Sequence, residues 1–192
     1  RIMTTIDCDI AIVGGGMAGS ALACALADSA YRIVIIENIK PKPLVRDDFF
    51  DPRVVAISPA SRYFFEKIGA WNFICNDRLS AFERMQVWDA DGTAQVFFDA
   101  AELNEKSLGH IVENNRVVAS LHQRLQQASN IHWLCPDAVT DLQDDAKTSH
   151  CELMLQSGQT VHCKLVVAAD GAQSTLRQLS CIKTIEWDYG HS

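Results

Sequence analysis

DIAIVGGGMAGSALACALADSAYRIVIIE, residues 9–37, decides the fold of this chain. Residues 10–13 form a continuous apolar run, which is typical of a parallel strand covered on both faces. Gly14, Gly16 and Gly19 then give the spacing G-x-G-x-x-G where this strand passes into a helix predicted over 17–27. A strand, a glycine turn, a helix and a second strand in this order predict an α/β fold with a Rossmann-like nucleotide-binding unit.

Each glycine has a steric role in the predicted turn. Gly14 permits the tight turn, Gly16 lets a pyrophosphate approach the backbone, and Gly19 lets the helix lie close on the sheet. Met17 and Ala18 open a helix of small residues, so the first N–H groups and the positive end of the helix can face an anion. The turn therefore predicts a phosphate-binding site.

Glu37 ends the second strand, eighteen residues after Gly19. An acid about 20 residues after the glycines hydrogen-bonds the adenosine ribose in dinucleotide-binding folds. A glutamate that ends a strand is more often a solvated end residue, but the motif before Glu37 favours the ribose role. An acid here, and not an arginine, disfavours a 2′-phosphate, so the sequence predicts the adenosine half of FAD or NAD.

The composition is that of an ordinary globular protein, with 48% hydrophobic and 21% charged residues. A net charge of −7 argues against a nucleic-acid partner and leaves no polybasic patch for an anionic membrane. No apolar run approaches the about 18 residues of a membrane span, and the first residues lack a signal-peptide layout. We therefore expect a cytoplasmic protein without a transmembrane segment, for which peripheral membrane contact stays open.

Cysteine and histidine spacing predicts neither a metal site nor a disulfide framework. The seven cysteines form no C-x-x-C pair and their number is odd, and the six histidines show no metal-binding spacing. We expect Cys24, Cys151 and Cys163 to be buried thiols that act as small hydrophobic side chains.

The middle of the chain interrupts the α/β pattern. A long loop over 38–53 has the composition of a functional loop, and a helix is predicted from Ser58 at its N-cap to Gly69 at its stop. Residues 82–99 read as a hairpin that turns at Asp91-Gly92. The candidate inward side chains of the hairpin are Met85, Val87, Val96 and Phe98. After the hairpin, a helix is predicted over 115–128, capped by Asn114 or Asn115.

The last third of the chain predicts strands at 131–134 and 138–142, then a hairpin with strands over 151–156 and 160–168. Its final apolar run, 165–169, delivers Asp170 and Gly171 at a carboxyl end, followed by a short polar turn and Arg177. Ligands of open α/β sheets bind outside the carboxyl ends of the strands, so Asp170 and the glycine turn can face one crevice. The alternative is that Asp170-Gly171 only makes a turn.

Three segments together resemble the para-hydroxybenzoate-hydroxylase-like flavoprotein monooxygenases: DIAIVGGGMAG, DPRVVAIS with its helix, and LVVAADGAQSTLR. Within that superfamily, the segments that contain MQVWD and GHIVEN resemble the ubiquinone-biosynthesis hydroxylases, closest to the branch that acts on 2-polyprenylphenols. The resemblance covers nearly the whole chain. It implies a Rossmann-like FAD-binding domain, built from a parallel sheet with helices and β-hairpins, together with the start of a second, substrate-binding sheet.

The resemblance also implies cofactor contacts, residue by residue. The glycines and Glu37 match the FAD fingerprint, while Asp170 and Gly171 match a second motif that contacts the flavin nucleotide. Arg53 matches an arginine beside the flavin, where a cation suits a pyrophosphate or an anionic reduced flavin. Asn114 matches a polar residue that contacts the cofactor just before a helix. No catalytic side chain is assigned.

The family pattern divides the chain into four parts: a first FAD-binding part over 3–80, a hairpin excursion toward the substrate domain over 81–100, a second FAD-binding part over 101–180, and the start of the substrate domain over 181–192. The later Gly-Asp motif of the family is missing. We therefore expect a truncated, front part of an enzyme, and whether it holds FAD or has activity by itself stays open.

The function that this resemblance implies is FAD-dependent hydroxylation of the aromatic ring of a 2-polyprenylphenol-type ubiquinone precursor, with dioxygen and with NAD(P)H as the electron donor. A prenylated phenol is the expected substrate, and other proteins of ubiquinone biosynthesis are candidate partners. Two alternatives stay open. One is an NAD-dependent dehydrogenase, and the other is a non-enzymatic nucleotide-binding subunit of a lipid-biosynthetic complex.

Overall fold

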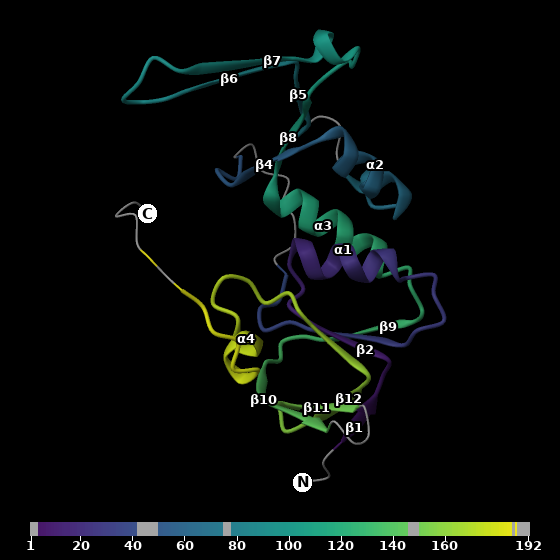
Figure 1. The fold of residues 1–192 in the computed structure, drawn as a ribbon. Helices are drawn as coiled ribbons and strands as arrows, with labels where there is room; N and C mark the ends of the chain where they lie inside the picture. The colour runs from purple at the N-terminus through teal and green to yellow at the C-terminus, as the bar shows by residue number, and fades with distance from the viewer. Residues whose placement is uncertain (1–3, 42–49, 75–77, 146–149, 186, 188–192) are drawn as a thin grey trace. The chain divides into compact units, whose positions relative to one another are not determined.

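The structure is a computed structural model that describes residues 4–41, 50–74, 78–145, 150–185 and 187 (Figure 1). The chain divides into two compact units, which we describe separately: unit 1 comprises residues 1–40 and 129–192, and unit 2 comprises residues 41–128. Residues 42–49 of the predicted loop 38–53 and residue Cys75 lie outside the described residues, as does most of 186–192.

Unit 1 contains the predicted parallel sheet. Its strands are β2 (Ile10–Val13), β3 (Ile33–Ile36), β9 (Ile131–Leu134) and β13 (Leu165–Ala168), in the order β13-β2-β3-β9. All three pairings are parallel. Helix α1 (Met17–Ala25) connects β2 to β3 and ends two residues before its predicted end. The α/β, Rossmann-like fold is thus confirmed.

The centre of this sheet is buried because β2 and β3 consist only of apolar residues. Every residue of both strands is buried, and Ile12 and Ile35 are fully inaccessible. This agrees with the continuous apolar runs of parallel strands that are covered on both faces. The sheet is thereby a rigid base whose carboxyl edge carries the glycine turn.

A second sheet of unit 1 has the order β1-β12-β11-β10. The strands are β1 (Thr5–Asp7), β10 (Val139–Asp145), β11 (His150–Leu155) and β12 (Thr160–Cys163). The single strand predicted over 160–168 is wrong, because β12 and β13 belong to different sheets. The chain changes sheet at Lys164, where the N–H groups of Lys164 and Leu165 both donate to the Asp9 carbonyl.

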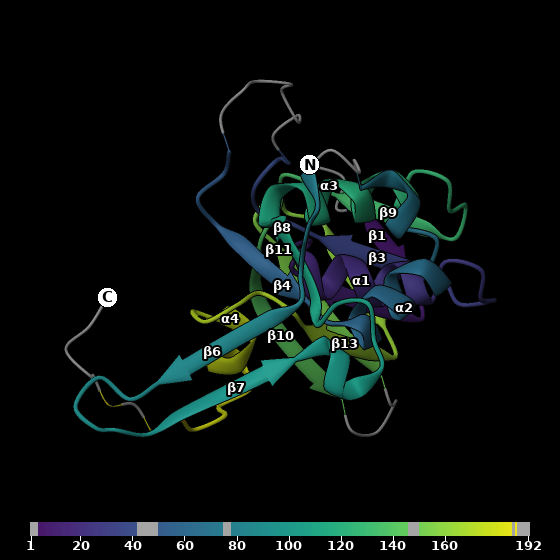
Figure 2. The same cartoon turned by 90° about the horizontal axis from the view of Figure 1, so that it is seen from above.

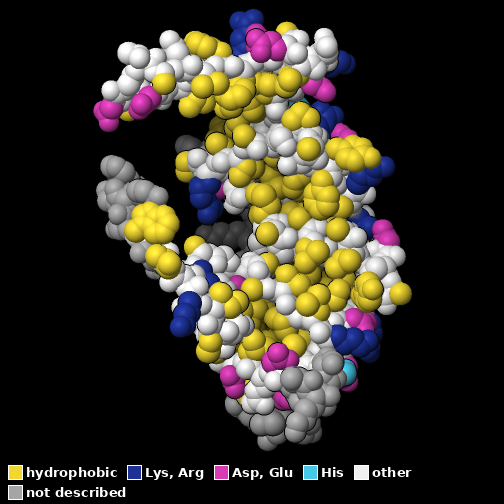
Figure 3. All heavy atoms as spheres, in the orientation of Figure 1, with side chains coloured by type: hydrophobic (Ala, Val, Ile, Leu, Met, Phe, Trp, Pro, Cys, Tyr) yellow, Lys and Arg dark blue, Asp and Glu magenta, His cyan; other side chains and the backbone are white. Residues whose placement is uncertain are grey.

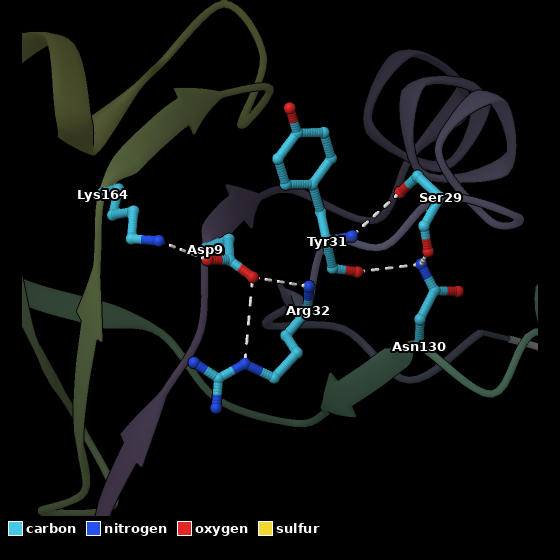
Figure 4. A network of polar contacts seen from close by, with 6 residues as sticks. All are labelled: Asp9, Ser29, Tyr31, Arg32, Asn130 and Lys164. Atoms are coloured by element: carbon cyan, nitrogen blue, oxygen red, sulfur yellow. Dashed lines mark hydrogen bonds and ion pairs between the residues drawn. The ribbon is translucent and has the colours of Figure 1, made fainter.

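Asp9 fixes the amino edge of the parallel sheet (Figure 4). Its carboxylate accepts from Lys164 Nζ at 2.8 Å and from the Arg32 N–H at 2.9 Å. The bond from Lys164 and then the bond from Arg32 hold the pKa of Asp9 below its ordinary value. Beside it, the Asn130 amide donates to the carbonyls of Ser29 and Tyr31. These contacts tie β2, β3, β9 and β13 together at the edge opposite the glycine turn.

Unit 2 is built on the antiparallel sheet β4-β8-β5, formed by β4 (Val54–Ile57), β8 (Gly109–Glu113) and β5 (Ser80–Phe82). Helix α2 (Pro59–Lys67) begins as predicted, because the Ser58 hydroxyl accepts the Ser61 N–H at 3.2 Å. Short 3₁₀ helices lie at Trp71–Phe73 and Ala100–Leu103.

Helix α3 (Asn114–Leu125) corrects one prediction. Glu113 occupies the N-cap position, and no side chain caps the helix, so the capping role predicted for Asn114 or Asn115 is wrong. The reason is that the Asn114 N–H donates to the Arg53 carbonyl, and Asn114 is already the first helical residue. Helix α4 (Thr175–Leu179), where a polar turn is expected, is a second difference.

The predicted hairpin is confirmed as β6 (Arg84–Trp88) and β7 (Gln95–Asp99) (Figure 2). The segment that joins the two strands contains Asp91 and Gly92. Register places Met85 opposite Phe98 and Val87 opposite Val96, so these four side chains share one face. They are 43–53% exposed, not packed inward. Hydrophobic side chains gather along this hairpin in the space-filling view (Figure 3).

Cys24 and Cys163 are buried as predicted, whereas Cys151 is only half-buried. Among the residues that the structure describes, no group of three or more potential metal-ligating side chains could hold a metal ion. Within the same residues, no helix is long and apolar enough to cross a membrane.

Candidate functional site

The glycine turn lies at the carboxyl edge of the parallel sheet, between the ends of β3 and β13. The Gly14 N–H donates to the Ile36 carbonyl at 2.8 Å, and the Ala169 N–H donates to the Val13 carbonyl at 2.7 Å. Because β13 is the direct neighbour of β2, Asp170 follows a strand end beside the turn. The expected juxtaposition of Asp170 with the glycines is therefore present.

Gly14 and Gly19 are required by close packing. Gly14 has a φ of +107°, and a Cβ atom there would lie 2.2 Å from the Ala169 carbonyl oxygen. A Cβ atom on Gly19 would lie 1.9 Å from the Gly14 carbonyl oxygen. A side chain at either position would displace backbone, so these glycines let α1 approach the ends of β2 and β13.

Gly16 differs, because a Cβ atom built on it meets no heavy atom within 4 Å. It occupies the N-cap position of α1, where no side chain caps the helix and no acid lies in the first turn. The first N–H groups of an α-helix lack intrahelical acceptors, so those of Met17 and Ala18 are available to an anion. The open space and these donors fit a phosphate group beside Gly16.

Glu37 is fixed against the turn by both carboxylate oxygens. Oε2 accepts the Gly15 N–H at 2.5 Å, and Oε1 accepts the Ile39 N–H at 2.8 Å. An ionised carboxylate offers about four acceptor positions, so about two stay available for ribose hydroxyl groups. The arrangement fits an adenosine ribose placed next to the phosphate-binding turn.

Sequence reasoning missed Trp133, which lies on β9. A Cβ atom on Gly15 would lie 2.7 Å from Cζ3 of Trp133 and 3.1 Å from Cβ of Glu37. The indole therefore packs against the backbone that donates to Glu37. Only the pairing of β3 with β9 brings Trp133 here, and no local pattern could have indicated it.

Asp170 organises the segment that follows β13. Its Oδ1 accepts the Ser174 hydroxyl at 2.6 Å, and its Oδ2 accepts the Leu176 N–H at 3.2 Å. The Ser174 hydroxyl in turn accepts the Arg177 N–H and caps α4. Gly171 has a φ of +84°, which favours glycine. Asp170 and Gly171 therefore form a turn, as the alternative interpretation states, and this turn lies beside the glycine turn.

Arg53 and Asn114, the other two predicted site residues, lie together in unit 2. The Asn114 N–H donates to the Arg53 carbonyl at 2.9 Å. The Arg53 side chain is 77% exposed and pairs with Asp51, its Nη2 lying 3.3 Å from Oδ2. The predicted site residues therefore fall into two groups. Arg53 and Asn114 lie together in unit 2, and the others, which are the residues of the glycine turn with Glu37, Asp170 and Gly171, lie in unit 1.

A glycine turn between a buried strand and a helix, with an acid at the end of the next strand, defines a dinucleotide-binding domain of the α/β class. Comparison with known families identifies which one. Residues 7–187 match the model of the FAD binding domain, and the chain belongs to this family of FAD-dependent monooxygenases. The family supports FAD, not the NAD of the dehydrogenase alternative, as the cofactor.

Curated relatives include two proteins of ubiquinone biosynthesis. The chain is 38% identical over 192 residues to the 3-demethoxyubiquinol 3-hydroxylase of Escherichia coli K12, covering 99% of this chain and 48% of that protein. It is 33% identical over 201 residues to the mitochondrial ubiquinone biosynthesis monooxygenase COQ6 of Homo sapiens, covering 96% of this chain and 42% of that protein. The chain spans about half the length of these relatives.

Solved structures share the fold. The PqsL protein of Pseudomonas aeruginosa matches with a TM-score of 0.75 at 20% identity, over 95% of this chain and 48% of that one. The p-nitrophenol 4-monooxygenase PnpA of Pseudomonas putida matches with a TM-score of 0.71 at 22% identity, over 91% of this chain and 43% of that one. At this identity the likeness concerns the fold alone.

Proposed function

We propose that this chain is the FAD-binding part of a monooxygenase that hydroxylates the aromatic ring of a 2-polyprenylphenol-type ubiquinone precursor. The observation that carries the proposal is the family match along 7–187, together with relatives at 38% and 33% identity that are named for ubiquinone biosynthesis. Dioxygen is the oxidant and NAD(P)H the proposed electron donor. When bound, FAD supplies the two-electron and oxygen chemistry that no side chain provides.

In this proposal the residues of the chain bind and orient the cofactor. Gly14, Gly16 and Gly19, with the N–H groups of Met17 and Ala18, hold the pyrophosphate, and Glu37 holds the adenosine ribose. Asp170 and Gly171 contact the flavin nucleotide from the neighbouring strand end. Arg53 provides positive charge beside the flavin, and Asn114 a polar contact. The open face of Gly16 and the free acceptor positions of Glu37 support these roles.

The hairpin over 81–100 is proposed as an excursion toward a substrate domain that begins over 181–192. Its support is the exposed apolar face formed by Met85, Val87, Val96 and Phe98, because an isolated two-stranded hairpin is only marginally stable in water. A prenylated phenol requires an apolar environment. Other proteins of ubiquinone biosynthesis and a membrane surface are proposed contacts of the whole protein.

A cytoplasmic location is proposed from the chemistry of the cysteines. The six cysteines within the described residues are free thiols, which suits a reducing compartment. The non-enzymatic alternative, a nucleotide-binding subunit of a lipid-biosynthetic complex, predicts partner binding without hydroxylation.

Disruption of the gene that encodes this chain tests the pathway. Mass spectrometry of the quinone fraction should show accumulation of a polyprenylphenol that lacks one ring oxygen, and the intact gene should restore ubiquinone. A wild-type pattern of prenylphenols in the disrupted strain would contradict the proposal. Restoration by a gene whose product binds FAD but hydroxylates no polyprenylphenol would favour the non-enzymatic alternative.

A further inference from the structure

Unit 2 contains a buried group of charged side chains that take no part in the cofactor contacts proposed above. Glu113 is 3% exposed, and two guanidinium groups lie against its carboxylate. Arg116 Nε donates to Oε2 at 2.9 Å, and Arg78 Nη2 donates to Oε1 at 3.3 Å. The side chains of Arg78 and Arg116 are only 11% and 10% exposed. We call these three residues the Glu113 triad.

The carboxylate of the triad is held in its charged form. Burial by itself raises the pKa of Glu113, but the hydrogen bond from the Asp51 N–H and the two guanidinium groups outweigh burial and bring the pKa below its ordinary value. A buried ion pair adds little stability compared with apolar packing, so a stabilising role alone explains the triad poorly. Its contacts outside the triad indicate what it holds.

Those contacts lead to the segment that carries Arg53. Glu113 stands at the N-cap position of α3, yet its side chain does not cap that helix. Instead, Oε1 accepts the Asp51 N–H at 2.7 Å. The guanidinium group of Arg78 also lies over the ring of Phe50, 3.8 Å from its centroid. The triad therefore contacts both Phe50 and Asp51.

Asp51, which is held by Glu113, in turn contacts Arg53. Its Oδ1 accepts the Arg53 N–H at 3.0 Å, and its carboxylate pairs with the Arg53 guanidinium at 3.3–3.4 Å. Asn114, the residue after Glu113, donates its N–H to the Arg53 carbonyl. Glu113, the last residue of β8, and Asn114, the first residue of α3, thus hold the two ends of the segment 51–53.

We propose that Glu113 is a positioning residue that orients Arg53 toward the flavin cofactor through Asp51. This inference rests on the proposed function, in which Arg53 contacts that cofactor. Arg53 is exposed, and an exposed arginine samples many rotamers. A fixed backbone and a neighbouring carboxylate restrict those rotamers before the cofactor binds, which strengthens binding by preorganisation.

A double-mutant cycle on the purified chain tests the inference, with FAD affinity measured by the change in flavin fluorescence. Arg53→Ala should weaken FAD binding about tenfold, as expected for the loss of one charge-assisted contact. Glu113→Gln should weaken binding by a smaller factor. If Glu113 acts through Arg53, the double variant should bind FAD no more weakly than Arg53→Ala alone.

Asp51→Ala provides the same test without disturbing the buried triad. This variant removes the carboxylate that holds Arg53, and its effect on FAD affinity should also vanish in the Arg53→Ala background. Glu66→Gln is the matched control, because Glu66 forms an exposed ion pair with Arg62 in the same unit. It should leave FAD affinity unchanged.

Each outcome decides the inference. Additive losses in both cycles would overturn it, as would a Glu113→Gln variant that loses thermal stability but binds FAD as the wild type does. An Arg53→Ala variant with unchanged affinity would overturn it while leaving FAD binding intact. A wild-type chain that binds no FAD would overturn the inference together with the proposed FAD site.

Discussion

Gly14→Ala should strongly destabilise unit 1, because the new side chain has no room. Its Cβ atom would lie 2.2 Å from the Ala169 carbonyl oxygen, and a residue with a side chain would have to adopt a φ of +107°. Backbone strain of this kind costs about 1–3 kcal/mol, and overpacking against fixed neighbours adds about 1–3 kcal/mol. Displacement of β13 also weakens the bond from Ala169 to Val13, worth about 1 kcal/mol.

The expected loss is therefore about 3–7 kcal/mol, a large part of the about 5–15 kcal/mol that stabilises a typical domain. Urea unfolding followed by far-ultraviolet circular dichroism measures this loss, and a slope of about 1–3 kcal/mol/M converts it to a midpoint lower by at least about 1 M. Gly16→Ala is the control, since its Cβ atom meets nothing within 4 Å. It should stay within about 1 kcal/mol of the wild type. A Gly14→Ala loss below about 1 kcal/mol would refute the steric argument.

Three further outcomes follow from single contacts. The pKa of Glu113 is lowered in the folded chain, so the stability that Glu113 contributes is present above its unfolded pKa and is lost as the pH falls through the folded pKa. Glu113→Gln should therefore lower the urea midpoint at pH 7 and make the midpoint fall less steeply between pH 7 and pH 3 than in the wild type. Equally steep falls in the two proteins would contradict this. Asp170→Ala removes both acceptors that hold the start of α4 and should lower the unfolding free energy by about 1–3 kcal/mol in urea titrations, whereas an unchanged midpoint would mean that α4 starts without it. Trp88 is 68% exposed, so Trp88→Ala should change the unfolding free energy of this chain by less than about 0.5 kcal/mol in the same assay; a larger loss would show that the side chain is packed.

Local patterns predicted the elements that local physics determines. The glycine turn could be predicted from the G-x-G-x-x-G spacing of Gly14, Gly16 and Gly19. The hairpin could be predicted from apolar and polar residues that alternate on both sides of Asp91-Gly92. The start of α2 at Ser58 was predictable because an N-cap uses neighbouring residues only. In each case the decisive contacts join residues close together in sequence.

Long-range contacts account for what the sequence could not predict. The start of α3 depends on the bond from Asn114 to Arg53, 61 residues earlier in the chain. Trp133 reaches the glycine turn only because β9 pairs with β3. The strand predicted over 160–168 is divided because the Asp9 carbonyl accepts two consecutive N–H groups where the chain changes sheet. The roles of the site residues toward FAD stay predictions.

Titration of the purified chain with FAD tests the central claim most directly, with flavin fluorescence or calorimetry as the readout. The glycine turn and Glu37 predict binding of one FAD per chain. They also predict that Gly16→Ala, with its fold unchanged, binds FAD at least about tenfold more weakly, because the new methyl group occupies the space beside the N–H groups of α1. Absence of binding by the wild-type chain, or equal affinity of the two chains, would contradict the account.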